Sequence, residues 1–134
     1  MQRGPAMVRR QQKQTNTRIE FDPGNASYHP IAAQGKNRDV PSLISPYTVS
    51  SMIYCTDCHN SEQAPGEGGK GPNGPHGSSY RPILARRLDL ADGTPEGEAS
   101  YALCYKCHNR DYLINESKID LKIRDSLWRR WQCS

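Results

Sequence analysis

Hydrophobic side chains are too sparse and too irregularly spaced to predict long helices or strands over most of this chain. Residues 21–46 are rich in Pro, Gly, Asn and Ser, and their few apolar positions follow neither a period of two nor one of 3.6. In residues 62–79, nine of eighteen positions are Gly or Pro, which excludes a helix or a central strand there. We therefore expect a mostly irregular fold with a few short α-helices.

Two segments before the C-terminus have a local pattern. Residues 47–54 combine β-branched and aromatic side chains, which predicts a short extended segment. Residues 94–109 predict a helix, with Thr94 as N-cap, Pro95 at the first helical position and Glu96 near the positive end of the helix dipole.

The two ends of the chain differ from its middle. Residues 1–18 carry five basic and no acidic side chains, which predicts a mobile basic arm over residues 1–20. Near the C-terminus an apolar side chain recurs every fourth residue, at Ile119, Ile123, Leu127 and Trp131. With the basic residues between them, these positions predict an amphipathic basic helix within residues 116–134, which covers the core or a partner rather than a membrane surface. Residues 21–115 then form the central domain.

Composition leaves that domain short of an ordinary core. Leu, Ile, Val and Phe contribute 20 of 134 residues, a level typical of disordered chains, yet the net charge is only +4. Burying hydrocarbon surface contributes roughly 25 cal/mol per Å², so a large apolar cofactor could replace the missing side chains. We expect no nucleic-acid binding, because the central domain is nearly neutral, and no integral membrane segment, because no apolar run is long enough.

One short element occurs twice and carries the chemistry. The pattern Cys-x-x-Cys-His is formed first by Cys55, Cys58 and His59, and again by Cys104, Cys107 and His108. On one helical turn the two thiols lie on the same side, where they can form thioethers with the vinyl groups of a porphyrin, and the adjacent imidazole can bind the iron. We therefore expect two covalently attached haem c groups, with His59 and His108 as the proximal iron ligands.

Two histidines remain, and they can serve as distal ligands. His29 and His76 would complete bis-His ligation of both irons, with ordinary surface histidines as the competing interpretation and Met52 as a weaker ligand. Iron with an imidazole on each face has no open position for a substrate. We therefore expect low-potential haems that transfer electrons, and no enzyme activity.

These residues resemble those of the multihaem c-type cytochromes that contain the doubled Cys-x-x-Cys-His motif. The resemblance spans roughly residues 25–117 and rests on the strings SYHP (27–30), YCTDCHNS (54–61), GPHGS (74–78) and YALCYKCHNR (101–110). It implies a small haem-organised multihaem cytochrome c domain, with the two motifs holding the haems and with His29 and His76 at positions like those of distal ligands.

The same resemblance implies a setting. Members of this family are periplasmic or extracellular electron carriers of respiring bacteria, including anaerobic respiration, and their partners are redox proteins or other multihaem cytochrome subunits, with self-association as a further option. No apolar secretory signal is present at the start of the sequence. Family members usually continue with more copies of the motif, so we expect a truncated or fragmentary version here, and Cys133 receives no role.

Two other functions are compatible with the same residues. Cys55, Cys58, Cys104 and Cys107 could form one structural Cys₄ zinc site, although 45 residues between the pairs make a long loop for a zinc ribbon. Alternatively, a haem-bearing chain could be the electron-input segment of a larger haem reductase.

Overall fold

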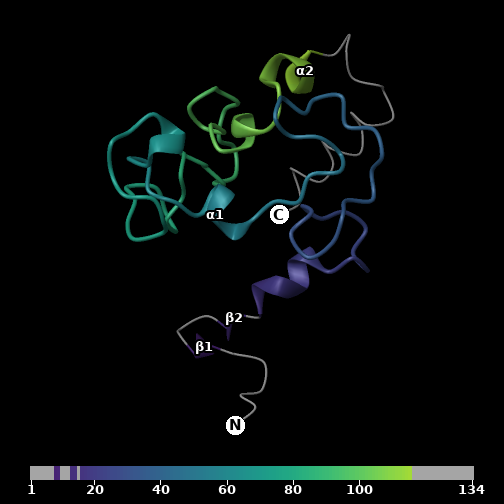
Figure 1. Ribbon diagram of the computed structural model, residues 1–134, viewed down its shortest axis with the longest axis horizontal. Coiled ribbons are helices and arrows are strands. Elements are labelled where there is room, and N and C mark those ends of the chain that lie inside the picture. Colours follow the sequence, from purple (N-terminus) through teal and green to yellow (C-terminus); the bar gives the residue numbers. More distant parts are fainter. Residues whose placement is uncertain (1–7, 10–12, 15, 116–134) are drawn as a thin grey trace. The chain divides into compact units, whose positions relative to one another are not determined.

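The regular elements of this protein are all short. The computed structural model describes residues 8–9, 13–14 and 16–115. Within them lie two strands, β1 (Val8–Arg9) and β2 (Lys13–Gln14), and two α-helices, α1 (Cys55–Cys58) and α2 (Arg110–Ile114). Three 3-10 helices are η1 (Thr17–Phe21), η2 (Pro65–Glu67) and η3 (Cys104–Lys106). Figure 1 shows them joined by long irregular segments, so the predicted mostly irregular fold with a few short helices is confirmed.

The chain divides into two units. Of the described residues, those up to residue 39 and residues 49–53 form the first, and residues 40–48 and 54–115 form the second. The predicted boundaries after residues 20 and 115 stay predictions. The basic amphipathic helix expected within residues 116–134, together with Cys133, lies outside the described residues.

Side-chain amides and single backbone bonds organise the first unit. β1 and β2 pair in antiparallel register. The Asn25 amide donates to the carbonyls of Ile19 and Glu20, both at 2.9 Å, and so satisfies backbone groups of η1. The Ile53 N–H donates to the Pro30 carbonyl at 2.9 Å, which joins residues 49–53 to this unit.

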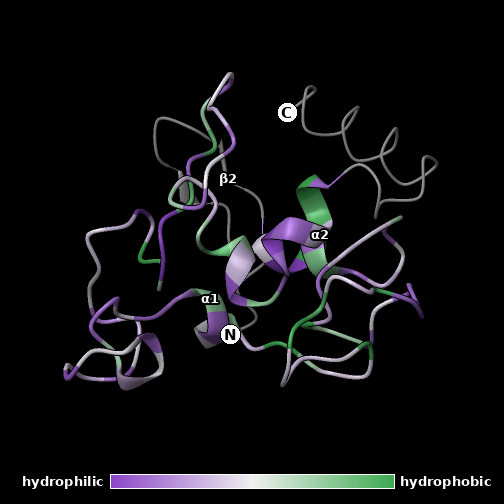
Figure 2. Ribbon diagram, turned by 90° about the horizontal axis from the view of Figure 1, so that it is seen from above, coloured by the Kyte–Doolittle hydropathy of each residue, from purple (hydrophilic) through white to green (hydrophobic). Residues whose placement is uncertain are grey.

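The buried core of the second unit is small. Among the described residues, the buried apolar side chains are Ala64, Leu84 and Ala85, and Ser42 and Ser61 are buried with them. Figure 2 shows short hydrophobic stretches scattered along a largely hydrophilic chain. Since no large side chain is fully buried in the described part, hydrogen bonds and ion pairs must hold much of this unit together.

The helix predicted for residues 94–109 is wrong. Turns occupy residues 98–103, and only η3 has regular helical geometry within the predicted range. The Leu103 N–H donates to the Arg87 carbonyl at 3.0 Å, and the Ser100 carbonyl accepts from the Asp89 N–H at 2.8 Å. Because these two bonds use backbone groups that a continuous helix would need for itself, tertiary pairing overrides the local helix signal.

Two other local predictions also change. The Thr94 hydroxyl donates to a carbonyl three residues earlier, at 2.7 Å, and Glu96 pairs with the Arg110 guanidinium instead of lying at a helix start. Residues 47–54 contain a turn at 49–50 and no strand, although Tyr54, at the end of the segment, has extended backbone angles. The β-branched and aromatic composition did not produce a strand; among the described residues the strands β1 and β2 pair only with each other.

The loop predicted for residues 62–79 is confirmed, and one glycine in it is required by close packing. η2 forms one turn within the loop, and the Gly71 N–H closes back on the Gln63 carbonyl at 2.7 Å. A Cβ added to Gly69 would lie 2.1 Å from the Gln63 carbonyl oxygen, whereas one added to Gly66 would meet nothing within 4 Å.

We therefore expect Gly69→Ala to destabilise the protein by about 2 kcal/mol, because the backbone must move to admit the methyl group. Gly66→Ala is the matched control and should be neutral or slightly stabilising, since alanine favours helical turns over glycine. Urea unfolding of both variants measures the difference. Equal midpoints for the two would contradict the close packing at Gly69.

Candidate functional site

Each of the two Cys-x-x-Cys-His motifs forms one helical turn, an α-helical turn in the first and a 3-10 turn in the second. In the first, formed by α1 and the residue after it, the His59 N–H donates to the Cys55 carbonyl at 2.7 Å. In the second, formed by η3 and the two residues after it, the His108 N–H donates to the Cys104 carbonyl at 3.1 Å. Positions three apart on such a turn lie on one face. The predicted single helical turn is therefore confirmed at both copies.

The imidazole of the first motif is held by a backbone carbonyl. His59 Nδ1 lies 2.9 Å from the Ile83 carbonyl oxygen, and the ring is partly buried. Because a carbonyl can only accept, Nδ1 carries the proton, and Nε2 of the neutral ring keeps its lone pair. A histidine oriented through one nitrogen in this way can bind a metal through the other.

The carbonyl that orients His59 belongs to a residue with unusual backbone geometry. Ile83 has φ of 78°, and a β-branched residue rarely adopts this left-handed conformation. The N–H groups of Ile83 and Leu84 both donate to the Tyr80 carbonyl at 2.9 Å, and the Ala85 N–H donates to the Cys58 carbonyl at 2.8 Å. The segment is thus bound on both sides of Ile83, which keeps its carbonyl directed at the imidazole.

The imidazole of the second motif is held by a buried serine. His108 Nδ1 lies 2.9 Å from Ser42 Oγ, and Ser42 is only 4% exposed. Backbone bonds surround this contact: the Asn109 N–H donates to the Ser42 carbonyl at 2.7 Å, and the Ile44 N–H donates to the Cys107 carbonyl at 3.0 Å. Each motif therefore has its histidine ring oriented by an oxygen from a distant part of the chain.

The thiols are reduced and mostly withdrawn from solvent. Cys55 is exposed, the other three are partly buried, and none of the four forms a disulfide. Burial raises the pKa of the Cys58, Cys104 and Cys107 thiols above the ordinary value, so they are protonated at neutral pH. Reactive redox dithiols and thiolate nucleophiles require the opposite shift.

The four thiols do not form a metal site of their own. Within residues 16–115, which include all four, no three His, Cys, Asp or Glu side chains lie close enough together to hold a metal ion. The geometry therefore gives no support to a Cys₄ zinc module.

The two remaining histidines lie in different units. His76 is exposed in the glycine-rich loop of the second unit, and its Nε2 lies 2.8 Å from the point where a Cβ of Gly74 would be. Glycine at position 74 therefore allows the imidazole to lie against the backbone. His29 is exposed in the first unit, where its carbonyl accepts from the Ile31 N–H at 2.8 Å.

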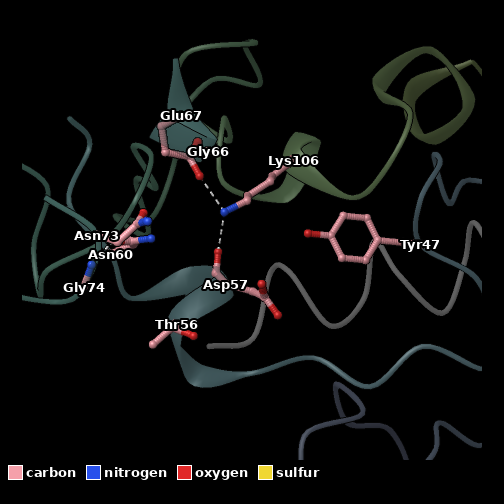
Figure 3. A pocket seen from close by; sticks show the side chains of 9 residues that line it. All are labelled: Tyr47, Thr56, Asp57, Asn60, Gly66, Glu67, Asn73, Gly74 and Lys106. Carbon is pink, nitrogen blue, oxygen red and sulfur yellow. Dashed lines mark hydrogen bonds and ion pairs between the residues drawn. The ribbon is translucent and has the colours of Figure 1, made fainter. Parts of the chain in front are cut away.

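A cavity of about 500 Å³ is lined by residues of both motifs. Thr56 and Asp57 line it from α1, Lys106 lines it from η3, and the Tyr47 hydroxyl points into it (Figure 3). The other lining residues are Asn60, Gly66, Glu67, Asn73 and Gly74. Burial, together with the neighbouring Cys107 thiol, raises the pKa of Tyr47 to about 12.

A buried ion cluster lies at this cavity. Glu67, whose side chain is 4% exposed, binds Lys106 Nζ through Oε1 at 2.5 Å and Arg86 Nε through Oε2 at 2.6 Å. Lys106 Nζ also donates to the Asp57 carbonyl at 2.7 Å, as Figure 3 shows. Burial acts to raise the pKa of Glu67, but the hydrogen bonds from Lys106 and Arg86 outweigh it, and the pKa lies below its ordinary value.

Sequence reasoning identified the motifs but not the residues that support them. Ser42 and Ile83 lie in segments without a recognisable pattern, and the pattern of residues 47–54 predicted only extended chain at Tyr47. The roles of these residues come from long-range contacts. Glu67 had one weak signal, since it is a carboxylate in a stretch otherwise dominated by Gly and Pro. Lys106 had none, because it occupies a variable position inside the second motif.

No protein-family model matches this chain, and no curated protein or solved structure is detectably similar to it. Among the described residues, no helix combines the length and apolar character needed to cross a bilayer. The functional assignment therefore rests on the motifs and their geometry.

The lowered pKa of Glu67 predicts a specific dependence of stability on pH. The contribution of the ion cluster is complete above the unfolded-state pKa of about 4.3, and it is lost as the pH falls through the lower folded-state value. At pH 7, Glu67→Gln should cost about 3 kcal/mol, at the low end for a buried pair because the Arg86 side chain is 38% exposed. Below pH of about 4 the difference from the wild type should shrink.

Denaturant unfolding across this pH range measures the effect. Glu98→Gln removes an exposed carboxylate and is the control, for which we expect a curve parallel to that of the wild type. If Glu67→Gln retained the acid dependence of the wild type, the ion cluster would not be the group that titrates.

Proposed function

We propose that this chain carries two covalently attached c-type haems and transfers electrons. The observation that supports this most strongly is the shared geometry of the motifs. Two separate stretches of chain each place a pair of thiols on one helical turn, and a histidine follows each pair. Nδ1 of the first histidine ring contacts a backbone carbonyl oxygen, and Nδ1 of the second contacts a serine hydroxyl.

The donor set fits a haem c at each motif. Cys55 and Cys58 would attach one haem, with His59 as its proximal ligand, and Cys104, Cys107 and His108 would do the same for the second. His59 meets the requirement of a metal-binding imidazole in detail, because its Nδ1 proton is directed at a carbonyl and Nε2 keeps its lone pair. When bound, a haem supplies an iron that gains or loses one electron.

Four thiols that form no disulfide are available for covalent attachment. Each thiol would add across one vinyl group, with sulfur bonding to one carbon and a hydrogen passing to the other, so the addition itself would need no external oxidant. Holding the thiols reduced and apart from a metal site leaves them available for this reaction.

The apolar surface of the protein also favours a large apolar cofactor. The described core contains only three buried apolar side chains, and Tyr54, immediately before Cys55, leaves 69% of its surface exposed. A porphyrin bonded to Cys55 would give this ring an apolar neighbour and would add to the core area that the side chains lack. We expect Tyr101, Tyr105 and Tyr112 to contribute similar contacts.

We assign electron transfer rather than catalysis because both irons can be fully ligated. His76 and His29 are the distal ligands in this proposal, which gives bis-His ligation and low reduction potentials. Haem is attached to such motifs after export, so the setting is periplasmic or extracellular, and the partners are redox proteins or other multihaem subunits. A role as the electron-input segment of a larger reductase would use the same haem sites.

Two haems per chain is the first expected result. Protein made with a cytochrome c maturation system should gain the mass of two haems and give two equivalents in a pyridine haemochrome assay. The double variants Cys55→Ala/Cys58→Ala and Cys104→Ala/Cys107→Ala should each keep one haem. A colourless folded protein of unmodified mass would overturn the proposal, and one tightly bound zinc per chain would favour the Cys₄ alternative.

Replacement of a distal ligand should leave one iron with an open coordination position. His76→Ala should convert one of the two haems from a low-spin to a high-spin spectrum and allow the reduced haem to bind carbon monoxide. Lys70→Ala, which changes another exposed side chain of the same loop, should leave both haems low-spin. The same test on His29→Ala assigns the second ligand. If the spectrum of His76→Ala were unchanged, His76 would not be an iron ligand.

A further inference from the structure

We infer that Lys106 joins the two motifs into one unit and, through this tie, sets the mutual position of the two haems for electron exchange. The inference rests on the proposed function and adds a positioning residue to it. Lys106 neither attaches nor ligates a haem in this scheme, and its role follows from what its ammonium group contacts.

The tie connects equivalent positions of the two motifs. Asp57 is the second variable residue of Cys-x-x-Cys-His in the first copy, and Lys106 is the second variable residue in the other. Lys106 Nζ donates to the Asp57 carbonyl at 2.7 Å (Figure 3). A contact between the turns that carry the attachment residues leaves little freedom for one motif to move against the other.

The ionic contacts of Lys106 are buried, so they favour one specific placement of the two motifs. The Lys106 side chain is 15% exposed and that of Glu67 is 4% exposed, so water competes weakly for either charge. Buried ion clusters of this kind often contribute little net stability, because desolvation offsets their attraction, but they penalise arrangements in which a charge loses its partner. The cluster therefore favours one relative placement of the motifs over others of similar compactness.

A backbone segment makes a second, parallel connection. At one end it contacts the first motif, where Ile83 O accepts from the His59 ring and the Ala85 N–H donates to Cys58. Two residues later, the Arg87 carbonyl accepts from Leu103, directly before the second motif. Between these points, the Arg86 side chain reaches Glu67 at 2.6 Å, so the ion cluster braces this connection as well.

Relative placement matters for the proposed function because electron exchange between two haems falls steeply with their separation and depends on their orientation. A tie close to both attachment points controls these quantities more directly than contacts elsewhere in the chain. The expected consequence of losing the tie is therefore a change in haem-to-haem coupling, without loss of either haem.

Lys106→Met tests this inference in the haem-loaded protein. The variant removes the donors but keeps an unbranched side chain. We expect it to retain two haems by mass and an unchanged axial-ligand spectrum. The two-signed circular dichroism signal in the Soret region, which arises from the mutual orientation of neighbouring haems, should lose most of its amplitude, and the separation between the two reduction potentials should narrow.

Three further variants complete the experiment. Lys70→Met, on the exposed part of the glycine-rich loop, is the matched control and should retain the wild-type signal. Lys106→Arg keeps a cation and should recover part of the Soret dichroism signal that Lys106→Met loses. Glu67→Gln leaves an acceptor for Lys106 but no charge, and it should weaken the signal in the same direction, which provides a second readout if Lys106→Met does not accumulate.

The outcomes separate the two proposals. If the wild-type chain carried no haem, both the proposed function and this inference would be contradicted. Two haems in Lys106→Met with the wild-type dichroism and potentials would overturn the positioning role of Lys106 alone, and the electron-transfer proposal would stand.

Discussion

The arrangement of the candidate site depends on one short length of backbone, residues 83–89. Its carbonyl at Ile83 orients the His59 ring, and its later N–H and carbonyl groups pair with the chain that leads into the second motif. Those pairings also explain why residues 94–109 do not form a helix, since backbone groups at 100 and 103 bond to this segment instead. The same contacts therefore decide the local fold and the support of both motifs.

Polar interactions carry an unusual share of the structure. With three small or medium apolar side chains buried in the described part, the hydrophobic contribution from the chain itself is slight. The contacts that hold the chain are polar: the Glu67 ion cluster, the bidentate pair between Arg110 and the Glu96 carboxylate, and side-chain hydrogen bonds that close single turns. Such interactions fix geometry well but add little net stability, which is consistent with a fold completed by a large apolar cofactor.

The variable residues of the two motifs are as informative as the cysteines and histidines. Asp57 accepts from the Tyr54 N–H through its carboxylate, at 2.7 Å, which caps α1. Its carbonyl accepts from Lys106, which ties α1 to η3. The chemistry proposed for the motifs requires only their invariant positions, so the remaining positions are free to determine how one motif is placed against the other.

The sequence by itself determined the irregular fold, the helical turn of each motif and the glycine-rich loop, and it is the source of the proposed attachment chemistry. These follow from local properties: the spacing of Cys55, Cys58 and His59 fits one helical turn, and dense Gly and Pro exclude regular structure. Tertiary structure decided the partners, namely Ser42 beside His108, Ile83 beside His59 and Glu67 between Lys106 and Arg86. No local pattern encodes these contacts, because each joins residues at least 19 positions apart and depends on which backbone groups remain unpaired after the loops fold.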